Sequence, residues 1–301
     1  MSLLVHQLQT HSRRWKRISL DLSGHYFPHL LTFTSCDLSS LEQLCIIGAL
    51  GYGGCLDLEC ARNLKSFAYC RDGPDSLVEK INLRWEQLEE VSFQLGRRGH
   101  GHISYGHFEC LALCQNITTC SLRTCEGYPY TKTDWPKVTL PCLRTLRVRL
   151  GSFSHNVNRV VRFLILPQLQ TLDISPEFQV QYAFPLSEDN RFSDLLELSN
   201  CSLRYLSIEG VNLPSNDILR CLKLSDTLLS FRYIPDPLSQ GGFGDVDCKL
   251  RALPLVVREQ IQLCKSLVPE LREITLGTSV QAYMDTTIAV FRSCGGACSG
   301  G

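Results

Sequence analysis

Apolar residues recur at a fixed short spacing along the chain. In the stretch PCLRTLRVRL, residues 141–150, Leu143, Leu146 and Val148 occupy the first, fourth and sixth positions of a six-residue unit. Arg144, Thr145 and Arg147 fill the second, third and fifth positions, and Arg149 follows as the seventh. Positions four and six lie two residues apart, so on a strand they point to the same face. The spacing therefore predicts a short strand that is entered from a turn, not a helix.

The same unit occurs ten times in order. Its first, fourth and sixth positions are Trp15/Ile18/Leu20, Leu41/Leu44/Ile46, Leu64/Phe67/Tyr69, Leu88/Val91/Phe93, Ile117/Cys120/Leu122, Leu143/Leu146/Val148, Leu169/Leu172/Ile174, Leu203/Leu206/Ile208, Leu228/Phe231/Tyr233 and Leu271/Ile274/Leu276. Most gaps between successive first positions fall within the range of about 20–29 residues that is typical of leucine-rich repeats. One such strand has nothing against which to bury its apolar row, so the units must stack on each other.

These observations predict an α/β fold, a leucine-rich-repeat solenoid of about ten irregular repeats. It is expected to be a curved horseshoe with parallel strands on the concave face and with helices and irregular turns on the convex face. We expect a single domain over 1–301, with an N-terminal capping helix at 1–14, repeats at 15–278, and a C-terminal cap and flexible tail at 279–301. The ninth position of a typical repeat carries Asn or Cys, and only Cys125 satisfies this rule, which predicts loosely ordered turns.

Apolar residues at helical spacing predict return helices between the strands. The predicted helices lie within 154–166, 187–198, 215–226 and 253–269. In the first of them, Val157, Val160, Val161 and Leu164 would share one face.

Composition narrows the functional classes. Lys and Arg number 30, as do Asp and Glu, which argues against a nucleic-acid-binding or membrane-surface protein. No apolar run is long enough for a transmembrane helix. The 16 cysteines mostly replace apolar residues within periodic segments, so reduced thiols in a cytoplasmic or nuclear protein are expected. We expect a monomer.

Motifs for catalysis are missing from the sequence. No phosphate-binding loop, G-x-S-x-G or H-E-x-x-H is found, so we expect neither an enzyme nor a cofactor. One stretch raises the alternative of zinc. If 107–115 is helical, His107, Cys110 and Cys114 share a face, and His100 or His102 could complete a tetrahedral site. The competing interpretation is that both thiols belong to the core, and we predict no metal.

In a leucine-rich repeat, positions three, five and seven of each strand face the concave side. The residues predicted to contact a partner there are Arg123, Thr145, Arg147, Arg149, Asp173, Tyr205, Glu209 and Arg232. Arg123, Arg147 and Arg149 fall on adjacent strands about 4.8 Å apart, where they could bind carboxylates or phosphates. The alternative is pairing within the chain, with Asp173 as the acceptor.

Residues 11–20, H-S-R-R-W-K-R-I-S-L, resemble the junction that follows the F-box in F-box/leucine-rich-repeat proteins of basidiomycete fungi. The later stretches LPCLRTLRV and LPQLQTLDIS resemble the repeat strands of the same family. The resemblance covers most of the chain and implies a substrate adaptor. In that family an F-box hairpin docks on a Skp–cullin ubiquitin ligase core, and the repeats capture a protein for ubiquitination. No F-box-like helix is visible in this sequence. A ligase-independent scaffold or an inhibitor-like binding protein is therefore the alternative.

Overall fold

A long, mostly parallel sheet dominates the fold. The computed structural model describes residues 10–21, 37–48, 56–71, 81–95, 105–124, 137–150, 161–176, 192–211, 213, 215–234, 268, 270–276 and 289–292. Within them, eleven strands form one sheet whose spatial order follows the chain. These strands are β1 (Arg17–Asp21), β2 (Gln43–Ile47), β4 (Ser66–Arg71), β6 (Glu90–Leu95), β7 (Thr119–Thr124), β9 (Thr145–Leu150), β11 (Thr171–Pro176), β12 (Tyr205–Glu209), β13 (Ser230–Ile234), β14 (Glu273–Leu276) and β15 (Ala289–Arg292). The first ten are parallel, and β15 pairs with β14 in the antiparallel sense.

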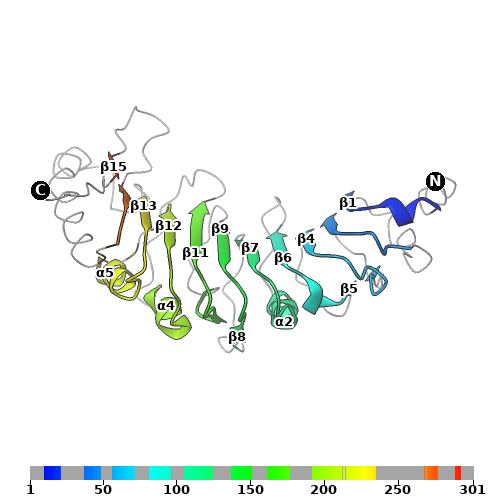
Figure 1. The fold of residues 1–301 in the computed structure, drawn as a ribbon, viewed down its shortest axis with the longest axis horizontal. Coiled ribbons are helices and arrows are strands. Elements are labelled where there is room, and N and C mark those ends of the chain that lie inside the picture. Colours follow the sequence, from blue (N-terminus) through cyan, green and yellow to red (C-terminus); the bar gives the residue numbers. More distant parts are fainter. Residues whose placement is uncertain are drawn as a thin grey trace, which may run out of the picture.

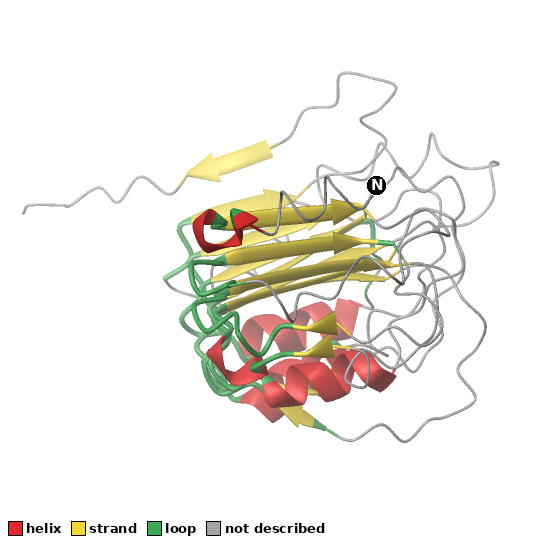
Figure 2. Cartoon of the chain, turned by 90° about the vertical axis from the view of Figure 1, so that its right-hand side faces the viewer, coloured by secondary structure: helices red, strands yellow, loops and turns green. Residues whose placement is uncertain are grey.

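A second layer covers one face of this sheet. It contains the helices α2 (Tyr105–Leu113), α4 (Ser193–Ser199) and α5 (Ser215–Lys223), the 3-10 turns η1 (Ser12–Arg14) and η3 (Trp85–Gln87), and two small parallel sheets, β3 (Leu56–Asp57) with β5 (Ile81–Asn82) and β8 (Val138–Thr139) with β10 (Leu164–Ile165). The long strands line the inner side of an arc, and α2, α4 and α5 lie on its outer side (Figure 1). Figure 2 shows the same two layers from the end of the arc. The predicted α/β fold with a long parallel sheet is confirmed.

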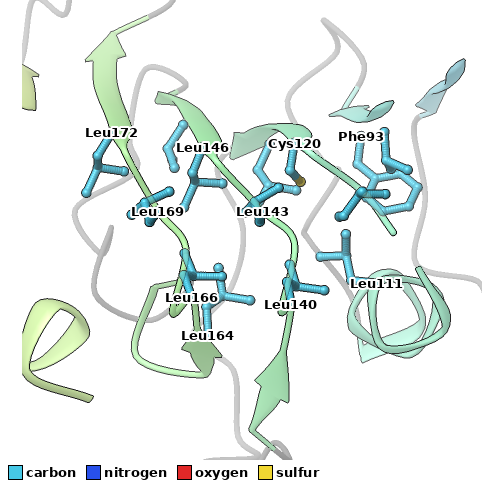
Figure 3. Packing of buried hydrophobic residues seen from close by; sticks show 14 of the residues in the cluster. Phe93, Leu111, Cys120, Leu140, Leu143, Leu146, Leu164, Leu166, Leu169 and Leu172 are labelled. Carbon is cyan, nitrogen blue, oxygen red and sulfur yellow. The ribbon is translucent and has the colours of Figure 1, made fainter. Parts of the chain in front are cut away.

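The strands pair so that equivalent apolar positions meet. The fourth-position residues Leu146 and Leu172 face each other, as do the sixth-position residues Val148 and Ile174. All four are buried, and so is Leu143, which enters from the turn. Leu140, Leu164 and Leu166 from the second layer pack beneath them, and Leu111 of α2 closes the neighbouring unit (Figure 3). The core therefore lies between the sheet and the second layer, and every unit covers the apolar row of the next.

The turns before the strands are held by hydrogen bonds to the preceding turn. The amides of Asn63, Gln87 and Asn116 donate to the carbonyls of Ser39, Ala61 and Glu86 at 2.6, 2.8 and 2.7 Å, respectively. Each of these side chains stands directly before a first apolar position. They satisfy backbone carbonyls, which is the role expected of the ninth position. Cys125 lies outside the described residues, and the described ninth position is Val211, a buried apolar residue.

Helix α4 begins on a carboxylate supplied by the next helix. Asp217 of α5 accepts hydrogen bonds from the backbone N–H groups of Phe192 and Ser193 at 2.8 and 3.0 Å. An acidic group at a helix N-terminus satisfies free N–H groups and opposes the helix dipole. The helix ends at Asn200, which takes the left-handed conformation at φ 45°. Asp217 thus locks α4 to α5.

The structure contains some of the predicted helices but differs from the prediction for another. Helix α4 overlaps the predicted range 187–198, α5 lies within 215–226, and α2 overlaps 107–115. Of the helix predicted over 154–166, the structure describes 161–166, where Val161 is helical but Leu164–Ile165 forms β10, so the predicted C-terminal end is wrong. The backbone pairing of β10 with β8 explains the difference, since Val138 and Leu140 donate to Phe163 and Ile165 at 2.7 and 3.0 Å. Local apolar spacing did not reveal this partner.

The predictions for the chain ends are only partly visible. The segment 253–267 and residues 1–9 lie outside the described residues. Of the capping helix predicted at 1–14, the structure describes residues 10–14, in which Thr10 is helical and η1 follows. Strand β15 falls within 279–301, where a cap and flexible tail were predicted. No helix in the described parts of the chain is long and apolar enough to cross a membrane.

Candidate functional site

One face of the long sheet carries the side chains of the third, fifth and seventh positions of the repeat units, and we call it the inner face. The three described α-helices lie on the opposite side of the sheet (Figures 1 and 2). Strand pairing aligns these positions into rows. One row of third positions runs from Thr119 through Thr145, Thr171 and Tyr205 to Ser230. The face is therefore a surface of ordered side-chain rows.

The predicted contact residues lie in three such rows, and most of them keep some exposure. Arg147 is exposed and Tyr205 is 48% exposed. The others, except Arg123, are half-buried: Thr145, Arg149, Asp173, Glu209 and Arg232. The strand register places Arg147 of β9 opposite Asp173 of β11, and it places Arg123 of β7 opposite Arg149 of β9.

Arg123 corrects the prediction of an exposed basic patch. Its side chain is only 7% exposed, although it occupies the expected seventh position. Alternation along a strand decides to which face a residue points, but not how far its neighbours cover it. Arg123 is therefore no accessible contact residue.

Two of the other predicted cations are engaged within the chain. Arg149 Nη2 lies 3.0 Å from Asp173 Oδ2 on the next strand, and Arg232 Nε pairs with Glu209. The alternative of intramolecular pairing is thus correct for Arg149. Because both partners of the first pair are partly exposed, it contributes no more than about 1 kcal/mol. Arg147 is the exposed cation of the predicted patch that makes no ion pair among the described residues.

The zinc alternative receives no support from the residues that the structure describes. His107 is buried edge-on against Phe93, with the ring centroids 5.0 Å apart. Cys110 and Cys114 are fully buried, and the Cys114 thiol donates to the Cys110 carbonyl at 3.1 Å. Burial raises the pKa of Cys114 to about 12, and it also raises the pKa of Cys110. Zinc binds thiolates, so protonated thiols in an apolar core favour the structural interpretation.

Across the described ranges, no three metal-ligating side chains come together. His100 and His102 lie outside these ranges. Cys110 of α2 and Cys114 directly after it thus act as small apolar residues in the core.

The structure also brings together a row that sequence reasoning missed. It consists of the second positions, which lie directly before the strands: Lys16, Glu42, Lys65, Glu89, Thr118, Arg144, Gln170, Arg204, Leu229 and Arg272. We call it the edge row. Each carbonyl from Lys16 to Leu229 accepts two N–H groups from the next strand's entry, as Arg144 does from Gln170 and Thr171 at 2.9 Å each. The signal was available in the sequence as a charge pattern at position two.

Neighbours in the edge row are close enough to pair. Lys65 Nζ lies 2.8 Å from Glu89 Oε1, and Lys16 Nζ lies 3.6 Å from Glu42 Oε1.

No protein-family model matches the chain, and no curated protein is similar to it in sequence.

Proposed function

We propose that the chain is a leucine-rich-repeat solenoid that binds a protein partner on its inner face. The observation that carries this proposal is a sheet of ten parallel strands with one face packed on the core and the other turned away from the helices. Parallel sheets are usually covered on both faces, and extended concave surfaces are what solenoids use for binding.

The strand pairing supports the repeat assignment. From β1 to β14, every parallel pair joins third position to third and fourth position to fourth, as Gln43 with Ser66 and Leu44 with Phe67. The ordered turn-to-turn hydrogen bonds of Asn63, Gln87 and Asn116 also recur from one unit to the next. A stack of equivalent units explains both regularities.

We further propose that this binding serves a ubiquitin ligase, with the chain as the substrate-recognition region of an F-box-type adaptor in the cytoplasm or nucleus. This step rests on the resemblance of residues 11–20 to the segment that follows an F-box. Seven of the described cysteines are free thiols, namely Cys45, Cys110, Cys114, Cys120, Cys142, Cys201 and Cys221, which agrees with a compartment that keeps thiols reduced.

A pair of variants tests binding on the inner face. Arg147→Glu/Tyr205→Ala changes two exposed side chains there, and Lys223→Glu/Leu224→Ala makes matched changes at exposed positions on the outer side. Crosslinked partners of the tagged protein should be lost with the first variant and kept with the second. Equal loss, or no loss, with both variants would count against the inner face.

Binding of a purified Skp-type subunit to the full-length gene product tests the ligase step. We expect a stable complex that survives gel filtration. If partners depend on the inner face but no Skp-type subunit binds, the chain is a ligase-independent scaffold.

A further inference from the structure

The edge row divides into two parts with different charge. In its first part, Lys16, Glu42, Lys65 and Glu89 alternate in sign along β1, β2, β4 and β6. In its later part, every charged residue is an arginine: Arg144, Arg204 and Arg272, which stand before β9, β12 and β14. The first part thus balances its own charge, and the later part does not.

The ion pairs Lys16–Glu42 and Lys65–Glu89 show that neighbouring side chains of the edge row are close enough to neutralise each other's charge. The hydrogen bond and the charge of Glu89, with a smaller contribution from Glu42, hold the pKa of Lys65 above its usual value. Opposite charges on adjacent strands therefore interact wherever the sequence places them in this row.

The later part has no such partners. Arg144, Arg204 and Arg272 are exposed, and among the described residues none of their guanidinium groups makes an ion pair or hydrogen bond. Asp226 and Glu270 stand in the turns before β13 and β14, and in the described part of the chain neither makes an ion pair with these arginines. Arg144 and Arg204 are separated by one strand, β11, so their backbones lie about 9.6 Å apart.

Hydroxyl groups lie beside these arginines. Thr145, Thr171 and Tyr205 follow one another in register on β9, β11 and β12, next to Arg144, Gln170 and Arg204 in the chain. Tyr205 is about half exposed, and both threonines are partly exposed. This strip, Arg144, Thr145, Gln170, Thr171, Arg204 and Tyr205, offers hydrogen-bond donors and positive charge and contains no carboxylate.

We propose that this donor strip binds an acidic, extended segment of a protein partner, rich in Asp and Glu, that crosses β9, β11 and β12 along the edge of the inner face. The proposal rests on the proposed function, for which it names the chemistry of the partner. Guanidinium groups bind carboxylates through two parallel hydrogen bonds, and the hydroxyl groups can donate to the remaining oxygens.

The charge distribution favours a protein segment over a nucleic acid. The chain has no net charge, and Asp173 and Glu209 stand two strand positions or more beyond the strip on the same face. A polyphosphate backbone needs a broad basic surface, whereas a short acidic segment needs only the few cations of the strip.

A titration with defined peptides tests the proposal. The probe is a fluorescently labelled peptide with glutamate at every third position, compared by anisotropy with a peptide that has glutamine instead. The glutamate peptide should bind more tightly, and Arg144→Glu/Arg204→Glu should raise its Kd at least about tenfold. That factor corresponds to about 1.4 kcal/mol, which two charge-assisted contacts can supply.

A matched control separates a site from general charge attraction. Arg62→Glu/Arg84→Glu makes the same change in net charge at exposed turn positions before earlier strands, and neither side chain is in an ion pair within the described ranges. It should leave the Kd within about twofold. Far-ultraviolet circular dichroism should show both double variants folded, because all four residues are exposed.

Three results would overturn the proposal: equal binding of the two peptides, equal weakening by both double variants, or displacement of the glutamate peptide by a lower concentration of a single-stranded oligonucleotide. The proposed function fails separately. If Arg147→Glu/Tyr205→Ala abolishes partner capture while the glutamate peptide does not bind, the inner face binds a partner of another chemistry.

Discussion

The earlier and later halves of the sheet, β1 to β6 and β9 to β14, are built alike on one face and differ on the other. On the buried face, leucine and other large apolar residues fill equivalent positions throughout, as Leu44 and Leu206 do. On the inner face, the fifth positions of the earlier half are all small, namely Ser19, Cys45, Ala68 and Ser92, whereas those of the later half include the charged residues Arg147, Asp173 and Arg232.

This difference shows which positions are free to carry specificity. A buried side chain must match the volume left by its neighbours, because cavities and overpacking are both costly. Substitution of an exposed side chain changes the free energy of unfolding little. The later half therefore combines the common scaffold with an exposed charge pattern of its own, and the following measurements examine each side of that contrast.

The largest effect is expected on the shared, buried face. Leu44→Ala on β2 and Leu206→Ala on β12 each remove a fourth-position side chain that is 2% exposed. Each should lower the free energy of unfolding by about 2–5 kcal/mol, because a buried cavity remains. Urea denaturation followed by circular dichroism measures both. A large loss in one half only would show that the two halves are not packed alike.

The second-largest loss of stability is expected in α4 and α5, the helices of the later half. Asp217→Ala removes the acceptor of two buried N–H groups at the start of α4 and should cost about 2 kcal/mol. Asp226→Ala, at an exposed turn position, is the control and should change the free energy of unfolding by less than about 0.5 kcal/mol. Similar values for the two variants would contradict a capping role for Asp217.

A smaller effect is expected in the turns. Asn116→Ala removes the hydrogen bond to the Glu86 carbonyl and should cost about 1 kcal/mol. Gln168 occupies the equivalent position before Leu169 but is exposed and makes no side-chain hydrogen bond in the described part of the chain, so Gln168→Ala should be nearly neutral. The same denaturation experiment compares them, and a cost as large for Gln168→Ala would remove this contrast between the turn before β7 and the turn before β11.

The smallest effect is expected from the inner-face ion pair. A double-mutant cycle of Arg149→Ala and Asp173→Ala should give a coupling energy of at most about 1 kcal/mol, since both side chains are partly exposed. The coupling should fall further as salt is added. A coupling that is larger and insensitive to salt would mean that the pair is shielded from solvent and structurally important.

The long sheet was predictable from the sequence because its signal is local and repeated. In each unit, apolar residues two positions apart predict the strand. Residues such as Leu143, Leu146 and Val148 therefore indicate a strand without reference to any other part of the chain. Strand β10 was missed because two residues cannot show a period, and pairing with β8 alone defines it. The cap on α4 was missed for a similar reason, since Asp217 acts across 24 residues of chain.

The candidate site was predicted less well than the fold. Position in a strand correctly aligned Arg147 with Asp173 and Arg123 with Arg149. It did not reveal that Arg123 is buried or that Arg232 is paired with Glu209, because coverage and rotamer choice depend on neighbouring strands. Arg144, which the spacing places in the entry turn, became informative only when the edge row was assembled.

The sequence by itself determined that strands form at these intervals and which of their residues face the core, because both follow from the spacing of apolar side chains along a backbone with a two-residue period. Only the tertiary structure decided which charges are neutralised and which remain available. Whether a cation is satisfied depends on side chains more than 20 residues away that come within about 3 Å, as Asp173 does for Arg149 and as no described carboxylate does for Arg144 or Arg204.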